Sequence, residues 1–211
     1  MANDGMSDDS STLHGSAPDQ SPVALLIIDM INDLEYPGGE ELYGHSLPVA
    51  QRIAELKRRA QAANIPVIYA NDNFGRWRSD FRQVVAHCLY DGVLGQPLAE
   101  LLKPDPDDYF VLKVKHSAFF VSTLETLLKY LGVRTLILAG IAGDNCVLFT
   151  ANDAYMRDLA IYVPADCVAS ISAEENSRAL AYMQRVTKAD IRPSTELDLG
   201  ELGRRRAACP P

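Results

Sequence analysis

Short apolar runs alternate with longer segments whose apolar residues recur every three or four positions, from residue 23 to residue 192. The runs predict buried strands, and the longer segments predict amphipathic helices. The predicted strands are residues 23–28, 66–70, 109–114, 135–139, 161–163 and 189–192, the last at an edge of the sheet. The predicted helices are residues 47–63, 80–89, 98–102, 122–132 and 147–159, and one that begins at residue 172.

Boundary residues support this division. Ser46 and Pro48 are typical of a helix cap and a first helical turn, residues 122–125 and 172–175 match the capping box, and Gly132 is typical of a helix end. Strands joined by helices run parallel, with helices on both faces of the sheet. We therefore predict a three-layer αβα sandwich around a mostly parallel six-stranded sheet, a Rossmann-like α/β fold.

The length of 211 residues, with 47% hydrophobic and 23% charged residues, is typical of one globular domain. Residues 1–21 are rich in Ser, Asp, Gly and Pro and have few large apolar groups, which predicts a disordered leader. The domain is expected to occupy residues 22–195, and residues 196–211 are expected to form a C-terminal tail.

The acidic balance of the chain limits its partners. A net charge of -8 argues against nucleic-acid and anionic-membrane binding, because both need a basic face. No apolar run approaches the ~20 residues that span a bilayer, and the N-terminus lacks the features of a secretory signal. The four cysteines are far apart along the chain, which favours free thiols in the cytoplasm.

Three reactive side chains lie at the exits of predicted strands, Cys146 one step past a short turn. Asp29, Lys113 and Cys146 meet at one edge if these strands are parallel neighbours, the edge where α/β proteins place their chemistry. Cys146 also opens a predicted helix, where the dipole stabilises a thiolate, and the loop 140–145 offers backbone N–H groups to an oxyanion. Each residue also has a structural interpretation: a buried cysteine, a turn aspartate, and a lysine that Lys115 could replace.

The motifs around these residues resemble those of the isochorismatase-like cysteine hydrolases. They are VALLIIDM at 23–30 with Asn32-Asp33, KVKHSAF at 113–119, and GIAGDNC at 140–146 with ANDA at 151–154. The resemblance extends from about residue 23 to residue 191 and implies the fold of that superfamily.

The resemblance also implies roles for individual residues. Cys146 is the expected nucleophile of a thioester mechanism, Asp29 the general base and acid, and Lys113 the electrostatic partner. A cis peptide bond is expected between Ile141 and Ala142, with the N–H groups of Ala142 and Cys146 forming the oxyanion hole. We expect hydrolysis of a small amide, ureido or related acyl C–N bond, without a cofactor.

Departures from the family pattern leave alternatives open. Ile31 stands where many relatives have Gln, and residues 71–75 contain no histidine, which argues against both a metal site and nicotinamidase activity. One alternative is an isochorismatase-type hydrolysis of a vinyl ether by Asp29 and Lys113 without the thiol. Another is a catalytically silent binding or regulatory protein on the same scaffold.

The expected partner is a small-molecule substrate, and the resemblance implies a homo-oligomer, either a dimer or a tetramer. Three arginines crowd one segment and are interpreted either as selecting a carboxylate or a partner subunit, or as ordinary surface residues: Arg76, Arg78 and Arg82. The residues expected to border the substrate pocket are Tyr36, Asn71, Asp72, Phe74, Trp77, His116 and Phe119.

Overall fold

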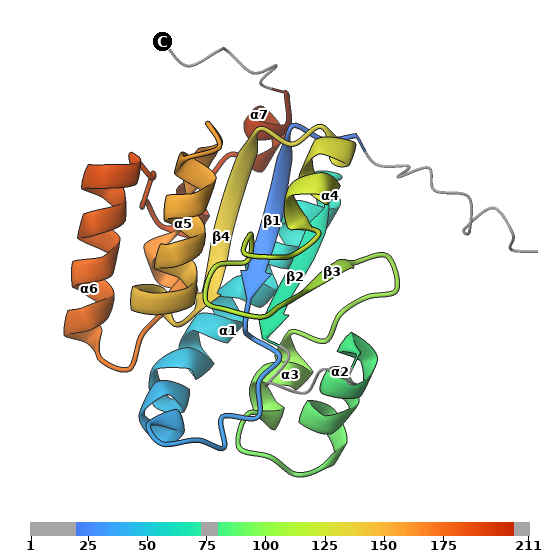
Figure 1. The fold of residues 1–211 in the computed structure, drawn as a ribbon, viewed down its shortest axis with the longest axis vertical. Helices are drawn as coiled ribbons and strands as arrows, with labels where there is room; N and C mark the ends of the chain where they lie inside the picture. The colour runs from blue at the N-terminus through green and yellow to red at the C-terminus, as the bar shows by residue number, and fades with distance from the viewer. Residues whose placement is uncertain (1–19, 73–79, 205–211) are drawn as a thin grey trace, which may run out of the picture.

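The computed structural model describes residues 20–72 and 80–204. Its parallel sheet has the strand order β3-β2-β1-β4-β5, with β6 paired to the end of β4 (Figure 1). The strands are β1 (Val23–Ile28), β2 (Val67–Asp72), β3 (Tyr109–Lys113), β4 (Thr135–Ile141), β5 (Ala160–Tyr162) and β6 (Val168–Ala169).

Helices cover both faces of this sheet, which confirms the predicted three-layer αβα fold. One face packs against α1 (Gly39–Ala62), α2 (Phe81–Tyr90), α3 (Gln96–Leu101) and α7 (Leu199–Arg204). The other face packs against α4 (Leu124–Leu131), α5 (Leu148–Tyr155) and α6 (Ala173–Tyr182), as Figure 1 shows.

The central strand β1 explains why its sequence is continuously apolar. All six of its residues are buried, because Leu25 and Ile27 face the α1 side while Leu26 and Ile28 face the α5 side. A strand that is covered on both faces carries apolar residues at successive positions, instead of alternating apolar and polar residues.

The predicted sixth strand is wrong in position. Within residues 189–192, Asp190 makes only an isolated bridge to Tyr162. The sixth strand is instead β6, whose two residues pair with Gly140 and Ile141 of β4. A strand of two residues has too short a pattern to be recognised in the sequence.

The first helix begins eight residues before the predicted start. Gly38 precedes α1 in a left-handed conformation, so Ser46 and Pro48 both lie inside the helix. The Ser46 hydroxyl donates to the Leu42 carbonyl one turn earlier (2.6 Å) instead of capping the helix. Pro48 has no N–H to donate to the carbonyl four residues earlier, and a proline inside a helix normally bends or breaks it.

The two predicted capping boxes differ in the structure. The Ser172 hydroxyl accepts a hydrogen bond from the N–H of Glu175 (3.2 Å), as a helix cap does. Ser122 lies one residue too early: its hydroxyl accepts from the N–H of Leu124 (3.2 Å), and α4 follows Thr123 without a side-chain cap. Gly132 ends α4 in the left-handed conformation, as predicted.

A buried lysine joins α1 to the loop before β3. Lys57 is almost fully buried and pairs with Asp108 (2.6 Å) and Asp105 (2.8 Å), while its ammonium lies 5.3 Å from the centre of the Tyr69 ring. The pKa of Lys57 is raised: burial alone would lower it, but contact with Tyr69 and the two carboxylates outweighs that effect. The ammonium therefore stays charged inside the protein.

Replacing Lys57 with Met is expected to destabilise the protein by about 3–5 kcal/mol, because the buried Asp108 carboxylate loses its partner. Urea denaturation measures this change. Lys129→Met is the matched control, since it removes an exposed pair with Glu125 and should cost less than about 1 kcal/mol. Equal losses in the two variants would contradict the assignment.

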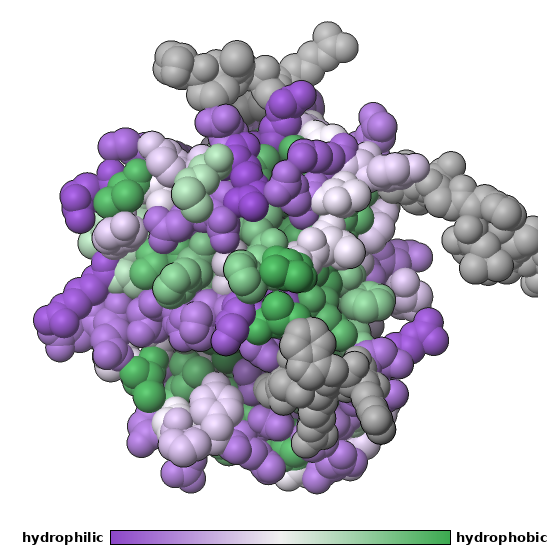
Figure 2. Space-filling model, viewed as in Figure 1, coloured by the Kyte–Doolittle hydropathy of each residue, from purple (hydrophilic) through white to green (hydrophobic). Residues whose placement is uncertain are grey.

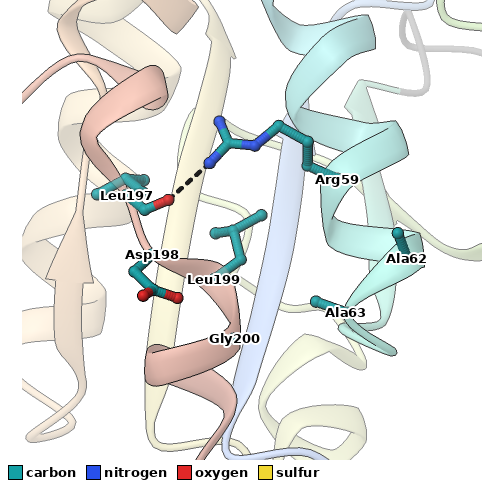
Figure 3. A pocket seen from close by; sticks show the side chains of 7 residues that line it. All are labelled: Arg59, Ala62, Ala63, Leu197, Asp198, Leu199 and Gly200. Carbon is teal, nitrogen blue, oxygen red and sulfur yellow. Dashed lines mark hydrogen bonds between the residues drawn. The ribbon is translucent and has the colours of Figure 1, made fainter.

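A hollow of about 430 Å³ lies where the strands begin, between the end of α1 and the segment before α7 (Figure 3). The Arg59 side chain reaches across it to the carbonyls of Leu197 (2.6 Å) and Ser194 (2.8 Å). Leu199 and Leu202 of α7 are buried in the same core as α1. The segment that contains α7 therefore packs on the domain. The predicted domain limits at residues 22 and 195 stay predictions.

Candidate active site

Four neighbouring strands deliver the polar residues of the site to one edge of the sheet. Asp29 follows β1 in a left-handed conformation (φ 51°), Lys113 ends β3, and Asp72 ends β2. Cys146 lies in a π-helical turn, Gly143–Val147, directly after β4 and before α5. The parallel register places Asp72 opposite Lys113, so these side chains converge although they are far apart in sequence.

The Lys113 ammonium is the centre of this cluster. Its Nζ lies 2.8 Å from Asp29 Oδ2, 3.4 Å from Cys146 Sγ and 3.7 Å from Asp72 Oδ2, and it donates to the Lys115 carbonyl (3.3 Å). The side chain of Lys113 is fully buried. Lys115 contributes its backbone here, whereas Lys113 contributes the ammonium.

The Asp29 carboxylate is held from two sides. Its Oδ1 accepts a hydrogen bond from the backbone N–H of Asp72 (2.7 Å), and its Oδ2 pairs with Lys113. An interaction with the Cys146 side chain also lowers the pKa of this carboxyl, so the sulfur lies near it. Asp29 is therefore oriented toward the sulfur and is within reach of its proton.

A hydrogen-bond network shapes the loop that carries Cys146. The peptide bond between Ile141 and Ala142 is cis, and the Ala142 carbonyl accepts from the N–H groups of Asn145 and Val147 (3.1 Å each). The Ser170 hydroxyl accepts from the N–H of Asp144 (3.1 Å). Ser170 directly follows β6, a strand too short to show in the sequence pattern, so no signal in the sequence marks it as a contact of this loop.

Comparison with known proteins places this geometry in a family. A model described as the isochorismatase domain matches residues 23–191, about four fifths of the chain. The chain belongs to the isochorismatase family. It is 44% identical over 168 residues to the "Uncharacterized isochorismatase family protein YaaI" of Bacillus subtilis, a match that covers 80% of this chain and 92% of YaaI.

Two further relatives of this isochorismatase-family hydrolase have named activities. The ureidoacrylate amidohydrolase RutB of Methylorubrum extorquens is 28% identical, with 70% of each chain covered. The crystal structure of N-carbamoylsarcosine amidase from Thermoplasma acidophilum aligns with a TM-score of 0.63 and 24% identity, covering 83% of this chain and 98% of the amidase. This structural alignment confirms the predicted fold of the present chain.

The thiol of this family member is protonated at rest, which corrects the expectation of a thiolate stabilised by a helix dipole. Burial raises the pKa of Cys146 to about 12, and the charge of Asp29 raises it further than Lys113 lowers it. Burial likewise raises the pKa of Asp29 against the opposing effect of Lys113. For Lys113, burial would lower the pKa, but the charge of Asp29 outweighs this effect, so the pKa is raised and Lys113 stays charged.

The predicted pocket residues fall at different distances from this cluster. Burial of its hydroxyl and the charges of Asp29 and Asp33 raise the pKa of Tyr36 to about 12, so this hydroxyl lies near the Asp29 carboxylate. Asn71 is buried and donates to the Ile31 carbonyl (2.7 Å), a polar contact near the position where relatives have Gln. The pocket roles of both residues stay predictions.

The remaining pocket residues are less central. The exposed His116 lies against Phe149, with ring centres 5.4 Å apart. Phe119 is buried in the core, where the Arg157 guanidinium covers its ring. Four of the residues singled out in the sequence lie outside the described residues: Phe74, Arg76, Trp77 and Arg78. Arg82 is exposed on α2.

No group of three or more His, Cys, Asp or Glu side chains suited to a metal ion occurs among residues 20–72 and 80–204. In the same part of the chain, no helix is long and apolar enough to cross a membrane. The expectation of a metal-free site stays a prediction.

Proposed function

We propose that this hydrolase cleaves a small amide, ureido or related acyl C–N bond through a thioester on Cys146. The observation that carries the proposal is the position of the Lys113 ammonium, in contact with both the Asp29 carboxylate and the Cys146 sulfur. This arrangement combines a nucleophile, a base that can take its proton, and a cation that compensates the negative charge of either group.

In the acylation step, Asp29 takes the thiol proton as Sγ attacks the acyl carbon. The developing oxyanion lies at the N–H groups of Ala142 and Cys146. The protonated Asp29 then gives its proton to the leaving nitrogen, the C–N bond breaks, and ammonia or an amine departs. The product of this half-reaction is a thioester on Cys146.

In the deacylation step, Asp29 removes a proton from a water molecule as its oxygen attacks the thioester. The C–S bond breaks, the sulfur recovers the proton from Asp29, and a carboxylic or carbamic acid is released. The cycle needs no redox step and no cofactor. Lys113 stays protonated throughout, which the raised pKa of its ammonium supports.

The names of two relatives agree with C–N bond cleavage. RutB is named an amidohydrolase, and the Thermoplasma relative is named an amidase. We propose the same bond type here and leave the substrate open, because both are below 30% identity. We also propose a cytoplasmic location, which the free Cys88, Cys146 and Cys167 support.

The test combines a substrate screen with trapping of the acyl group. A panel of small amides and carbamoyl compounds is assayed for released ammonia, and an active compound is then quenched in acid and examined by mass spectrometry. The acyl mass is expected on Cys146, while the buried Cys88 and Cys167 stay unmodified. Cys146→Ala should show neither ammonia release nor an adduct.

The alternatives give different outcomes. Hydrolysis of a vinyl ether that persists in Cys146→Ala and disappears in Asp29→Asn would establish the thiol-independent reaction. Binding of a panel compound without turnover, and without any adduct on Cys146, would establish a silent binding protein.

A further inference from the structure

The turn that carries Cys146 packs tightly against β6 and α6. Gly143 begins this turn, and a Cβ on Gly143 would lie 2.6 Å from Val168 Cγ1 and 3.0 Å from the Ser170 hydroxyl. The same Cβ would be closest of all to Asn176 Oδ1. In Figure 1, α6 lies beside α5, the helix that the turn leads into. The nucleophile turn is therefore in direct contact with the first turns of α6.

A chain of three hydrogen bonds connects α6 to this turn. Asn176 Nδ2 donates to the Val168 carbonyl (3.0 Å). The Ser170 hydroxyl donates to Asn176 Oδ1 (3.1 Å) and accepts from the N–H of Asp144 (3.1 Å). Asp144 is two residues before the nucleophile, so the chain ends on the backbone that carries the thiol.

The direction of each bond follows from its partners. A carbonyl can only accept, so Asn176 turns its amide nitrogen to Val168 and its oxygen to Ser170. That amide oxygen also can only accept, so the Ser170 hydroxyl donates to it and keeps a lone pair for the Asp144 N–H. Ser170 is 1% exposed, so bulk water does not replace either partner. The chain therefore has a single arrangement.

Asn176 occupies a part of α6 whose other polar residues face solvent. Glu174, Glu175 and Ser177 are exposed, and Figure 2 shows hydrophilic residues where α6 begins. Asn176 is half-buried instead, and both ends of its amide are bonded inside the protein. Its amide therefore holds the loop after β6 and, through Ser170, the nucleophile turn.

These bonds fix the peptide groups around the proposed oxyanion donor. The Asp144 N–H is bound by Ser170, and the N–H groups of Asn145 and Val147 are bound by one backbone carbonyl at the start of the turn. The Cys146 N–H lies between these fixed groups, and peptide planarity limits how far it can rotate. A shift of about 1 Å in such a group can cost about 100-fold in rate.

We propose that Ser170 and Asn176 are positioning residues for the oxyanion hole. They act through the Asp144 N–H, which they hold toward α6, so that the Cys146 N–H stays directed at the position of the oxyanion. Without this chain the turn moves, although the sulfur and its proton acceptor are intact. The inference rests on the proposed function, because it needs an oxyanion at this N–H.

Acetaldehyde tests the oxyanion hole without a known substrate. The Cys146 sulfur bonds to the aldehyde carbon, the thiol proton passes to Asp29, and the carbonyl π electrons move to the oxygen, which becomes the oxyanion. This adduct blocks alkylation of Cys146, so the slowing of iodoacetamide alkylation by acetaldehyde gives the dissociation constant of acetaldehyde. Alkylation itself displaces iodide and forms no oxyanion, so its rate without acetaldehyde reports only on the thiol.

Ser170→Ala is expected to raise the dissociation constant of acetaldehyde at least about tenfold. The alkylation rate without acetaldehyde should stay within about twofold of the wild type, which shows that the variant is folded around the sulfur. Asn176→Ala should also raise the dissociation constant. Because the two residues act in series, the double variant should lose no more than Ser170→Ala loses alone.

Ser177→Ala is the matched control. Its exposed hydroxyl donates to the Ala173 carbonyl (2.8 Å) within α6, so this variant should match the wild type in both quantities. An unchanged dissociation constant in Ser170→Ala would overturn the proposal, as would losses that multiply in the double variant or a parallel fall in the alkylation rate. A wild type that acetaldehyde does not protect would also overturn it.

Failure of the proposed function gives a different result. In that case no compound of the amide and carbamoyl panel releases ammonia, while the dissociation constant of acetaldehyde still rises in Ser170→Ala. That outcome would support the positioning role and remove the amide chemistry.

Discussion

Asp29→Asn is expected to lose turnover by about 10³–10⁴-fold while its Cys146 thiol reacts faster with iodoacetamide. An amide cannot accept the thiol proton, so the acylation step stops. The same substitution removes the carboxylate charge and the hydrogen bond that raise the pKa of Cys146, whereas Lys113 still lowers it. Each unit by which the pKa falls raises the thiolate fraction at pH 8 about tenfold, partly offset by weaker nucleophilicity.

The measurement is the rate of iodoacetamide alkylation, followed by mass spectrometry of the peptide that contains Cys146. In the wild type, with a pKa of about 12, this rate should still be rising at about pH 10. In Asp29→Asn the rate at pH 8 should be at least about threefold higher. Asp107→Asn removes an exposed carboxylate before β3, at the opposite edge of the sheet, and should change neither quantity.

The pH dependence of turnover has a defined sign. The ionised Asp29 is the active form, so activity falls as pH drops through its pKa, which burial raises above the ordinary value of about 3.9. Cys146 enters the reaction as the neutral thiol, and Lys113 keeps its charge because its pKa is raised. Activity should therefore stay constant from neutral to mildly alkaline pH. A slow alkylation of Asp29→Asn, together with full turnover, would contradict this division of roles.

Gly140→Ala is expected to destabilise the protein by roughly 3–5 kcal/mol, from strain and overpacking together. Gly140 has a φ of 123°, and a Cβ there would lie 2.1 Å from the Ile28 carbonyl oxygen. That oxygen belongs to the backbone of the neighbouring strand, so relief requires β1 and β4 to separate next to Asp29. Urea denaturation should show the loss, and kcat should fall in the protein that remains folded.

Gly44→Ala provides the contrast. Gly44 lies inside α1, and a Cβ there would meet nothing within 4 Å outside the helix backbone. Alanine should stabilise the helix by about 0.5–1 kcal/mol. If Gly140→Ala and Gly44→Ala changed the free energy of unfolding by similar amounts, the close approach of β1 and β4 at Gly140 would not explain the stability of this end of the sheet.

The sequence predicts the parallel sheet because its central strands are buried on both faces and therefore read as unbroken apolar runs. The same runs end at Asp29 and Lys113, so the meeting of these residues follows from the strand ends alone. Asp72 extends β2 beyond its apolar part because it pairs with Lys113, a contact between strands that no local pattern records.

Other features depend on contacts that a linear pattern does not contain. The pKa of Cys146 is decided by burial and by Asp29, whereas its position before a helix predicts the opposite direction. The early start of α1 at Gly39 was missed because Ser46 and Pro48 are typical of a helix start. The Ser46 hydroxyl instead donates to the Leu42 carbonyl inside the helix, a contact that the linear pattern does not contain.

The buried, protonated sulfur of Cys146 also affects how readily the enzyme is oxidised when no substrate is bound. Peroxides attack thiolates and hardly react with neutral thiols, and the first product of that attack is a sulfenic acid. A thiol whose pKa is about 12 is almost never ionised at neutral pH. The Cys146 thiol is therefore protected from oxidation by peroxides in the free enzyme.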